Sequence, residues 1–191
     1  MRGGADAMKT LIINGSPRQN GDTVSLLNEL KTHLDGEIVE ISAYRDKISP
    51  CIDCRCCWEK LGCIINDDMA TIYADDFDNI IIASPVYMSN LTGPVLSLAS
   101  RFQVYFAASR ILKTPIKKRP KRGVLILVGG GDGGAEPAIE SAKLIFKMMN
   151  AKLSDDDIVL SLRTDVLPAR DDGLAVDRVR EVAKSVNGDF F

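Results

Sequence analysis

The sequence predicts an α/β fold, built as a doubly wound parallel sheet of five strands with helices on both faces. Strand-like and helix-like segments alternate along all 191 residues, which is the pattern of consecutive βαβ units. Three strand-like segments, at 11–13, 80–83 and 124–128, are unbroken apolar runs, as expected of central strands covered on both faces. With 46% hydrophobic residues and no internal repeat or linker, residues 1–191 are expected to form a single domain, with residues 1–8 disordered or peripheral.

The strands are identified by these apolar runs and by two shorter segments between the helical patterns. The acidic run Asp155-Asp156-Asp157 is interpreted as a turn that precedes the last strand. In chain order the five predicted strands are residues 9–14, 37–41, 79–84, 123–128 and 158–162.

The helices are identified by apolar residues at helical spacing and by their starting residues. In the first helix, Val24, Leu26, Leu27 and Leu30 give the apolar face. Asp67 and Asp68 are expected to cap the second helix. Pro94 can stand in the first turn of the third, where its missing N–H is not needed. In chain order the five predicted helices are residues 23–34, 68–75, 94–108, 135–150 and 174–186.

The loop after the first strand has the composition of a phosphate-binding loop. It reads Gly15-Ser-Pro-Arg-Gln-Asn-Gly-Asp-Thr23 and leads directly into the first helix. Backbone N–H groups at a helix N-terminus attract anions, Ser16 and Thr23 can add hydroxyl donors, and Arg18 can add charge. The loop matches neither a Walker sequence nor the dinucleotide Gly-x-Gly-x-x-Gly pattern. The alternative is an ordinary βα turn with good capping residues.

Three loops are expected to meet at the carboxyl edge of the sheet, where ligands of such folds bind. They are residues 15–22, 84–93 and 129–134. The second carries Pro85, Val86 and Tyr87. The third is almost all glycine and allows a flat ligand to approach the backbone closely, although simple flexibility would also explain it. A phosphate loop beside an aromatic turn and a glycine turn favours a mononucleotide with a planar ring.

These motifs resemble those of the NADPH-dependent FMN reductase family. The likeness rests on Gly-Ser-Pro-Arg-x-x-Gly-x-Thr after the first strand, Ser-Pro-Val-Tyr after the third and the glycine loop after the fourth. It implies a flavodoxin-like fold with strand order 2-1-3-4-5 and FMN as cofactor. The resemblance implies that the FMN phosphate is held by Ser16, Arg18, Asn20 and Thr23. It implies that the flavin ring is bordered by Pro85, Val86 and Tyr87 and that its polar edge lies near Ser84 and Asn90. It also implies that the ring is covered by Gly129, Gly130 and Gly131.

The sequence departs from the family pattern at two places. Leu96 and Ser100 replace a Lys and an Asp that are common in relatives after the Pro-Val-Tyr turn. Asp22 stands where relatives often carry Asn, and an ionised carboxylate beside a phosphate would repel it. We therefore expect Asp22 to cap the helix that starts at Thr23 and to face away from the anion.

All five cysteines lie between residues 51 and 63, in the insertion 46–66 that follows the second strand. Cys51, Cys54, Cys57 and Cys63 give the spacing C-x2-C-x2-C-x5-C, which can supply four thiolates to a 4Fe–4S cluster. The spacing resembles the iron–sulfur flavoprotein branch of the same family and leaves Cys56 as an extra residue. A zinc site, a transient redox disulfide and a loop of unligated thiols are the alternatives.

The composition of the chain excludes some classes of binding partner. A net charge of −2 argues against nucleic acid or an anionic membrane as the main partner, and no apolar run approaches membrane-spanning length. Residues 1–7 lack the apolar stretch of a signal peptide, so a cytoplasmic location is expected.

The basic stretch 113–122 is interpreted as a solvated loop, with docking of an acidic carrier or of the NADPH phosphate as the alternative. The single histidine, His33, is expected at the surface, and triad hydrolysis is poorly supported.

The resulting hypothesis is an FMN-dependent oxidoreductase or electron-transfer flavoprotein that takes electrons from NAD(P)H or a ferredoxin-like donor and reduces an acceptor such as a quinone. The family likeness implies a homodimer or tetramer. Two alternatives stay open: a non-enzymatic electron carrier, and a redox- or metal-sensing module that works through its cysteine loop.

Overall fold

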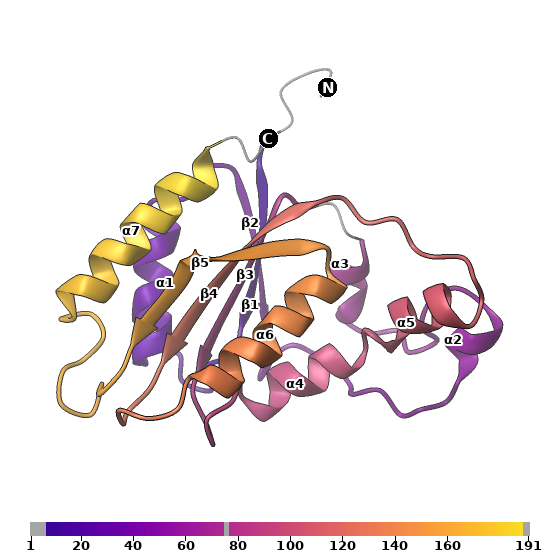
Figure 1. Ribbon diagram of the computed structural model, residues 1–191, viewed down its shortest axis with the longest axis horizontal. Coiled ribbons are helices and arrows are strands. Elements are labelled where there is room, and N and C mark those ends of the chain that lie inside the picture. The colour runs from indigo at the N-terminus through magenta and orange to yellow at the C-terminus, as the bar shows by residue number, and fades with distance from the viewer. Residues whose placement is uncertain (1–6, 75–76, 189–191) are drawn as a thin grey trace.

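The computed structural model describes residues 7–74 and 77–188, and its centre is a parallel sheet of five strands in the order β2-β1-β3-β4-β5 (Figure 1). The predicted fold and strand order are therefore confirmed. The three central strands hold the unbroken apolar runs, and their side chains are almost fully buried. The strands are β1 (Lys9–Asn14), β2 (Glu37–Ser42), β3 (Asn79–Pro85), β4 (Lys121–Val128) and β5 (Ala151–Ser161).

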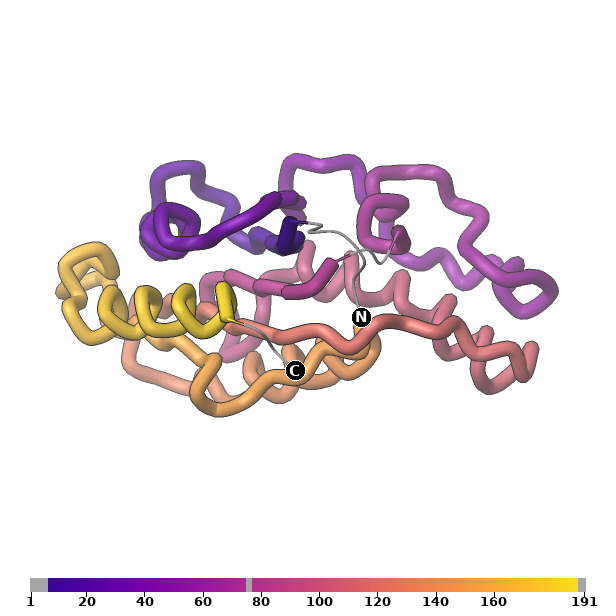
Figure 2. The backbone as a smooth tube through the Cα atoms, turned by 90° about the horizontal axis from the view of Figure 1, so that it is seen from above, coloured from indigo at the N-terminus to yellow at the C-terminus, as the bar shows by residue number. Residues whose placement is uncertain are grey.

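Helices cover both faces of the sheet, and a separate apolar core lies on each side (Figures 1 and 2). One core is closed by α1 (Asp22–Thr32) and α7 (Gly173–Asn187), which pack on residues such as Ile12 and Ile81. The other core lies beneath α3 (Met69–Tyr73), α4 (Gly93–Ser100), α5 (Gln103–Arg110) and α6 (Glu136–Met148). Because β-strand side chains alternate between faces, neighbouring residues such as Ile12 and Ile13 fall in different cores.

The single helix expected over residues 94–108 is divided into α4 and α5. At the junction Arg101 N–H bonds to Leu98 O and Phe102 N–H bonds to Ala99 O, both at 3.0 Å. These i to i−3 bonds tighten the chain into a 3₁₀-like turn, which redirects the helix axis. The expected helix 68–75 is described as α3, which ends at Tyr73; its last predicted residue, Asp75, lies outside the described residues.

The last strand begins seven residues earlier than expected, at Ala151. The acidic run 155–157, interpreted as a turn, lies inside β5 beside an irregularity in its pairing with β4. The carboxylate of Asp157 is 4% exposed and pairs with Arg122 at 2.6 Å, which compensates its charge. An acidic run can therefore continue a strand here because the neighbouring strand supplies the counter-charge.

The insertion between β2 and α3 projects beyond the end of the sheet. It contains the short helix α2 (Cys56–Glu59), which the sequence does not predict, and α2 lies beside α5 (Figures 1 and 2). The capping position of α3 is Asp68, whose side chain makes no capping hydrogen bond, while Asp67 Oδ1 accepts the N–H of Met69 at 3.1 Å.

The basic stretch 113–122 is only partly the solvated loop that was expected. Lys121 is 1% exposed and donates to the carbonyl oxygens of Arg119 and Met149, and Lys118 lies 3.7 Å from the ring centre of Tyr105. Lys113 and Lys117 remain exposed. His33 is at the surface, beside Glu29 at 3.2 Å. No helix within residues 7–74 and 77–188 has the length and apolar character needed to cross a membrane.

Candidate functional site

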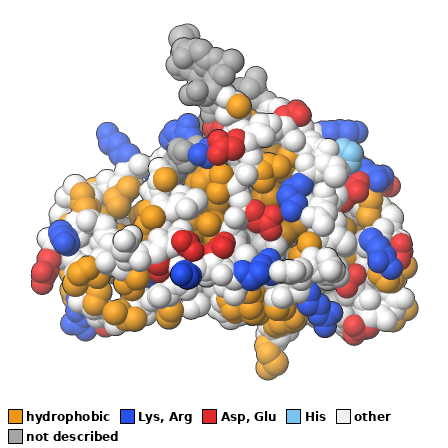
Figure 3. All heavy atoms as spheres, turned by 180° about the vertical axis from the view of Figure 1, so that it is seen from behind, with side chains coloured by type: hydrophobic (Ala, Val, Ile, Leu, Met, Phe, Trp, Pro, Cys, Tyr) orange, Lys and Arg blue, Asp and Glu red, His pale blue; other side chains and the backbone are white. Residues whose placement is uncertain are grey.

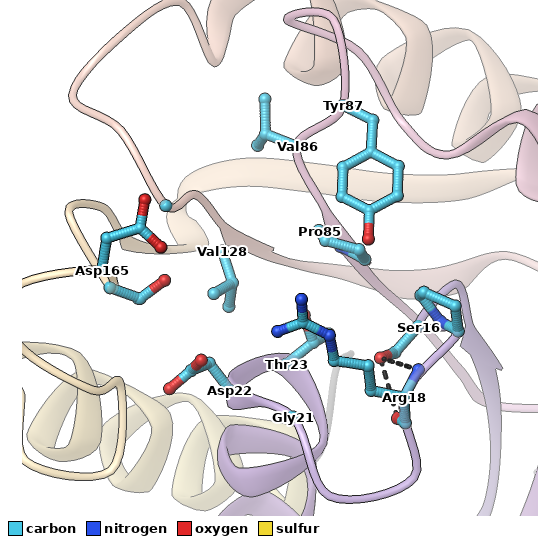
Figure 4. Close-up of a pocket in the computed structure, with 13 residues that line it drawn as sticks. Ser16, Arg18, Gly21, Asp22, Thr23, Pro85, Val86, Tyr87, Val128 and Asp165 are labelled. Carbon is cyan, nitrogen blue, oxygen red and sulfur yellow. Dashed lines mark hydrogen bonds between the residues drawn. The ribbon is translucent and has the colours of Figure 1, made fainter.

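A cavity of about 190 Å³ lies at the carboxyl edge of the sheet, where the predicted loops meet (Figure 4). Seven of the twelve predicted cofactor residues line it: Ser16, Arg18, Thr23, Pro85, Val86, Tyr87 and Gly130. The other five, which do not line it, are Asn20, Ser84, Asn90, Gly129 and Gly131.

The loop after β1 is fixed by a short chain of hydrogen bonds. Asn14 Oδ1 accepts the N–H of Ser16 at 2.9 Å, and the Asn14 amide donates to Glu40 Oε1 at 2.8 Å. Ser16 Oγ in turn accepts the N–H of Arg18 at 3.2 Å and donates to Arg18 O at 3.0 Å. Glu40 on β2 therefore orients Asn14, and Asn14 holds the turn at the start of the loop.

The N-terminus of α1 opens into the cavity. The first helical bond joins Ser25 N–H to Gly21 O, and within the described chain the N–H groups of Asp22, Thr23 and Val24 have no acceptor. Arg18 forms no ion pair with any described residue, and Figure 4 places its guanidinium in the middle of the cavity. Free N–H donors at a helix N-terminus beside an unpaired guanidinium attract anions.

Asp22 does not act as the expected cap. The capping position is Gly21, no side chain caps the helix, and Asp22 is the first helical residue. Its Oδ1 instead accepts the N–H of Ala169 at 2.9 Å, from the loop before α7. Asp22 also lines the cavity.

The turn after β3 forms the second wall. Val86 N–H bonds to Val128 O at 2.8 Å, and Tyr87 and Asn90 exchange backbone bonds around a tight turn. Tyr87 is 46% exposed, and Figure 4 shows its ring above Pro85 with the hydroxyl directed toward Ser16. This wall offers a flat, mostly apolar surface to a planar ring.

Ser84 and Asn90 hold this turn rather than line the cavity. Ser84 Oγ accepts the N–H of Thr92 at 3.1 Å, and Thr92 Oγ1 donates to Gly15 O at 3.0 Å. Asn90 Oδ1 accepts the N–H of Leu91 at 2.8 Å.

The glycine loop after β4 is held by a fourth loop, which the sequence analysis missed. Thr164 N–H bonds to Gly129 O at 3.0 Å. The Asp165 carboxylate packs so closely on Gly130 that a Cβ added to this glycine would lie 2.8 Å from a carboxylate oxygen. Thr164 and Asp165 both line the cavity. Their position directly after the last strand, at the same sheet edge, was the available signal.

A second cavity, of about 300 Å³, lies in the cysteine insertion. All four predicted ligands, Cys51, Cys54, Cys57 and Cys63, line it, and Cys56 does not. Burial raises the pKa of the Cys57 thiol, and the other three thiols of the cavity raise it further. Cys56 Sγ instead contacts Cys54 O at 3.8 Å.

The thiols surround a space rather than a point. All five cysteines are free, and the described chain holds no group of three or more side chains close enough to bind a single metal ion. A zinc ion requires ligands that converge on one centre. The four thiols line one partly apolar cavity without converging on a common centre.

Helix α4 connects the two cavities. Before its first residue, Thr92 is hydrogen bonded to Gly15 in the phosphate loop, and at its last residue Ser100 Oγ accepts the N–H of Cys51 at 2.9 Å. The next residue, Arg101, lines the cysteine cavity and pairs with Asp67 at 2.7 Å.

The chain is similar to known proteins in sequence. Residues 8–162 match the model of the family described as NADPH-dependent FMN reductase. An iron–sulfur flavoprotein of Methanocaldococcus jannaschii is 37% identical over 141 residues, which cover 70% of this chain and 68% of that protein. A second one from the same organism is 33% identical over 145 residues, covering 73% and 72%.

The fold is also shared with solved flavoenzyme structures. An NAD(P)H:quinone oxidoreductase from Methanothermobacter marburgensis aligns with a TM-score of 0.70 at 12% identity and covers 97% of this chain and 100% of that one. An FMN-dependent NADH-azoreductase from Bacillus anthracis aligns with a TM-score of 0.62 at 19% identity, covering 94% and 100%. The family match and the similar iron–sulfur flavoproteins show that the chain belongs to the NADPH-dependent FMN reductase family, in its iron–sulfur flavoprotein branch.

Proposed function

We propose that the protein is an FMN-dependent electron-transfer oxidoreductase that takes electrons from NAD(P)H or a ferredoxin-like donor and reduces an acceptor such as a quinone, with a 4Fe–4S cluster in the cysteine insertion. The observation that carries the proposal is the cavity in which the free N-terminus of α1 and Arg18 lie opposite the flat wall of Pro85, Val86 and Tyr87. A phosphate site beside a ring-sized apolar wall suits a flavin mononucleotide.

Each wall of the cavity would have its own task. Ser16, Arg18 and Thr23 would bind the phosphate together with the N–H groups of α1, and Asn20, exposed in the same loop, would approach it only from outside the cavity. Asp22 and Asp165, which also line the cavity, leave one region of negative charge that the phosphate must avoid.

The remaining residues would position the ring. Pro85, Val86 and Tyr87 would border it and Gly130 would cover it, while Ser84, Asn90, Gly129 and Gly131 would keep the surrounding loops in place. When bound, FMN exchanges electrons in pairs or singly, and the protein supplies binding, orientation and exclusion of water.

The cysteine cavity would hold the cluster. Cys51, Cys54, Cys57 and Cys63 are the proposed ligands because these four, and not Cys56, line one space. Thiolates are the usual ligands of iron–sulfur clusters, and free thiols suit a reducing, cytoplasmic compartment.

The surface around this cavity supports assembly into a homodimer or tetramer. Apolar side chains gather at the end of the molecule where α2 and α5 lie (Figure 3). The exposed ones in this region are Ile52, Trp58, Leu61, Ile64 and Phe106. Exposed apolar patches of this kind mark contact surfaces.

The test is purification without oxygen, followed by flavin extraction and by assays of iron and acid-labile sulfide. The proposal expects about one FMN and about four irons per chain. Cys57→Ser should lose most of the iron, and the matched Cys56→Ser should keep it. Flavin without iron in the wild type would limit the protein to a simple flavin reductase, and absence of flavin after reconstitution would overturn the proposal.

The pure electron carrier is separated from an enzyme by steady-state oxidation of NAD(P)H with a quinone acceptor. The basic stretch 113–122, its supposed docking face, is less available than expected because Lys118, Lys121 and Arg122 contact the protein's own groups. Turnover with a quinone supports the enzyme.

A further inference from the structure

A buried arginine lies against the cysteine cavity. Arg101 is 2% exposed, stands at the break between α4 and α5, and lines the cavity together with the four proposed ligands. Arginine is rarely buried to this degree, and when it is, its charge needs compensation. Nothing in the flavin cavity accounts for its position.

Arg101 closes the base of the cysteine loop. Its Nη1 donates to Ser49 O at 2.9 Å, and its Nη2 donates to Ile65 O at 3.2 Å. These two carbonyl groups lie two residues before Cys51 and two residues after Cys63. The guanidinium therefore fixes both ends of the segment that carries the thiols.

One donor of the same guanidinium is unused. Arg101 Nε is fully buried and has no hydrogen-bond partner among the described residues. A buried donor without an acceptor is costly, and native proteins seldom keep one without a reason. The carboxylate of Asp67 cannot supply the missing acceptor readily, because it already accepts from Arg101 Nη1, Ser49 N–H and Met69 N–H.

The chemistry of the thiols supplies a reason for the buried positive charge of Arg101. A cluster held by four thiolates carries net negative charge and many sulfur acceptors, and charge and hydrogen bonds around the sulfurs set its reduction potential. In a partly apolar cavity a nearby cation stabilises the more negative, reduced form.

We propose that Arg101 is the positioning and charge-compensating residue of the cysteine cavity: it clamps the loop that carries the thiols and places a buried positive charge beside an anionic iron–sulfur cluster, which raises the cluster's reduction potential. This inference rests on the proposed cluster. Asp67 opposes the effect because its carboxylate partly neutralises the guanidinium.

The test measures the cluster potential by anaerobic dithionite titration followed by electron paramagnetic resonance, with iron content assayed on each sample. Arg101→Gln removes the charge, and the reduction equilibrium should fall at least about tenfold, a shift of about 59 mV for one electron. Asp67→Asn keeps Arg101 and should shift the potential in the opposite direction. Arg101→Lys keeps the charge and should restore most of the wild-type potential.

The control is Lys184→Gln on α7, which removes a charge on the opposite face of the sheet and should leave the potential unchanged. If Arg101→Gln cannot load a cluster, a raised potential in Asp67→Asn still supports the proposal. The charge role would be overturned if every variant that binds iron kept the wild-type potential. It would also be overturned if Arg101→Lys and Asp67→Asn lost their iron as well, because Arg101 would then only stabilise the loop. A wild type that holds flavin but no iron after reconstitution would overturn both the cluster and this inference.

Discussion

The carboxylate of Asp22 accepts a hydrogen bond from the backbone N–H of Ala169 at 2.9 Å, across 147 positions of sequence. The contact joins the first turn of α1 to the loop between β5 and α7, on two sides of the flavin cavity. It keeps a negative charge beside the proposed phosphate site, where we expect the carboxylate to stabilise the fold and to weaken phosphate binding.

Replacing Asp22 should separate these two effects. Asp22→Asn keeps an oxygen acceptor for Ala169 and removes the charge, so FMN should bind roughly 3- to 10-fold more tightly, which corresponds to about 1 kcal/mol. Asp22→Ala also loses the hydrogen bond and should lower the free energy of unfolding by about 1 kcal/mol. Flavin fluorescence titration at fixed ionic strength and urea unfolding are the measurements. Weaker FMN binding by Asp22→Asn would contradict this account.

Arg18 should recognise the phosphate and not the ring. Arg18→Gln removes a charged hydrogen-bond donor worth about 1.5–3 kcal/mol, so FMN affinity should fall roughly 10- to 100-fold. Riboflavin, which lacks the phosphate, should bind the variant and the wild type equally. Arg163→Gln is the control, because Arg163 lies on the same edge but is exposed and does not line the cavity. Equal losses for both ligands would place Arg18 elsewhere in the site.

Gly15 should tolerate no side chain. A Cβ at this position would lie 2.6 Å from Val95 Cγ2 and 3.2 Å from the backbone oxygen of Ala83. Gly15→Ala should therefore lower the free energy of unfolding by about 1–3 kcal/mol, the usual cost of overpacking. Gly131→Ala is the matched control, since no atom lies within 4 Å of its Cβ position. Chemical denaturation of the two apoproteins decides the point, and equal stabilities would contradict it.

Glu40 should make the free energy of unfolding depend on pH. Burial raises its pKa, but hydrogen bonds from Asn14 and Lys31 outweigh burial and hold the pKa below its ordinary value. Its contribution is therefore complete above the unfolded-state pKa of about 4.3 and is lost as pH falls through the lower pKa of the folded state.

Glu40→Gln should flatten the decline of melting temperature below about pH 4.3, with an effect at neutral pH under about 1 kcal/mol because the side chain is partly exposed. Glu37→Gln, on the same strand and with a more exposed carboxylate, is the control. Identical pH profiles for wild type and Glu40→Gln would remove Glu40 from the support of the phosphate loop.

The sequence predicts the sheet and the loop edge because both depend on local patterns. Runs such as Ile80 to Ala83 are typical of buried parallel strands, and the loops that follow parallel strands share one edge of the sheet. The sequence also predicts that the four cysteines lie close together, since their spacing keeps them within one short segment.

The misplaced features depend on contacts between distant residues. The helix over 94–108 breaks where Arg101 is drawn toward Ser49 and Asp67, which lie 52 and 34 positions away. Asp157 stays in a strand because Arg122, 35 positions away, pairs with it. No local periodicity carries such information.

The eight residues of α4 set the spacing between the two cavities. At about 1.5 Å per residue the helix is about 12 Å long, and hydrogen bonds near its two ends attach it to Gly15 and to Cys51. One inserted residue would lengthen it by about 1.5 Å and rotate one end by about 100° relative to the other. If FMN and a cluster occupy the two cavities as proposed, the rate of electron exchange between them within one chain would depend on the residue count of this single helix, because such exchange slows steeply with distance.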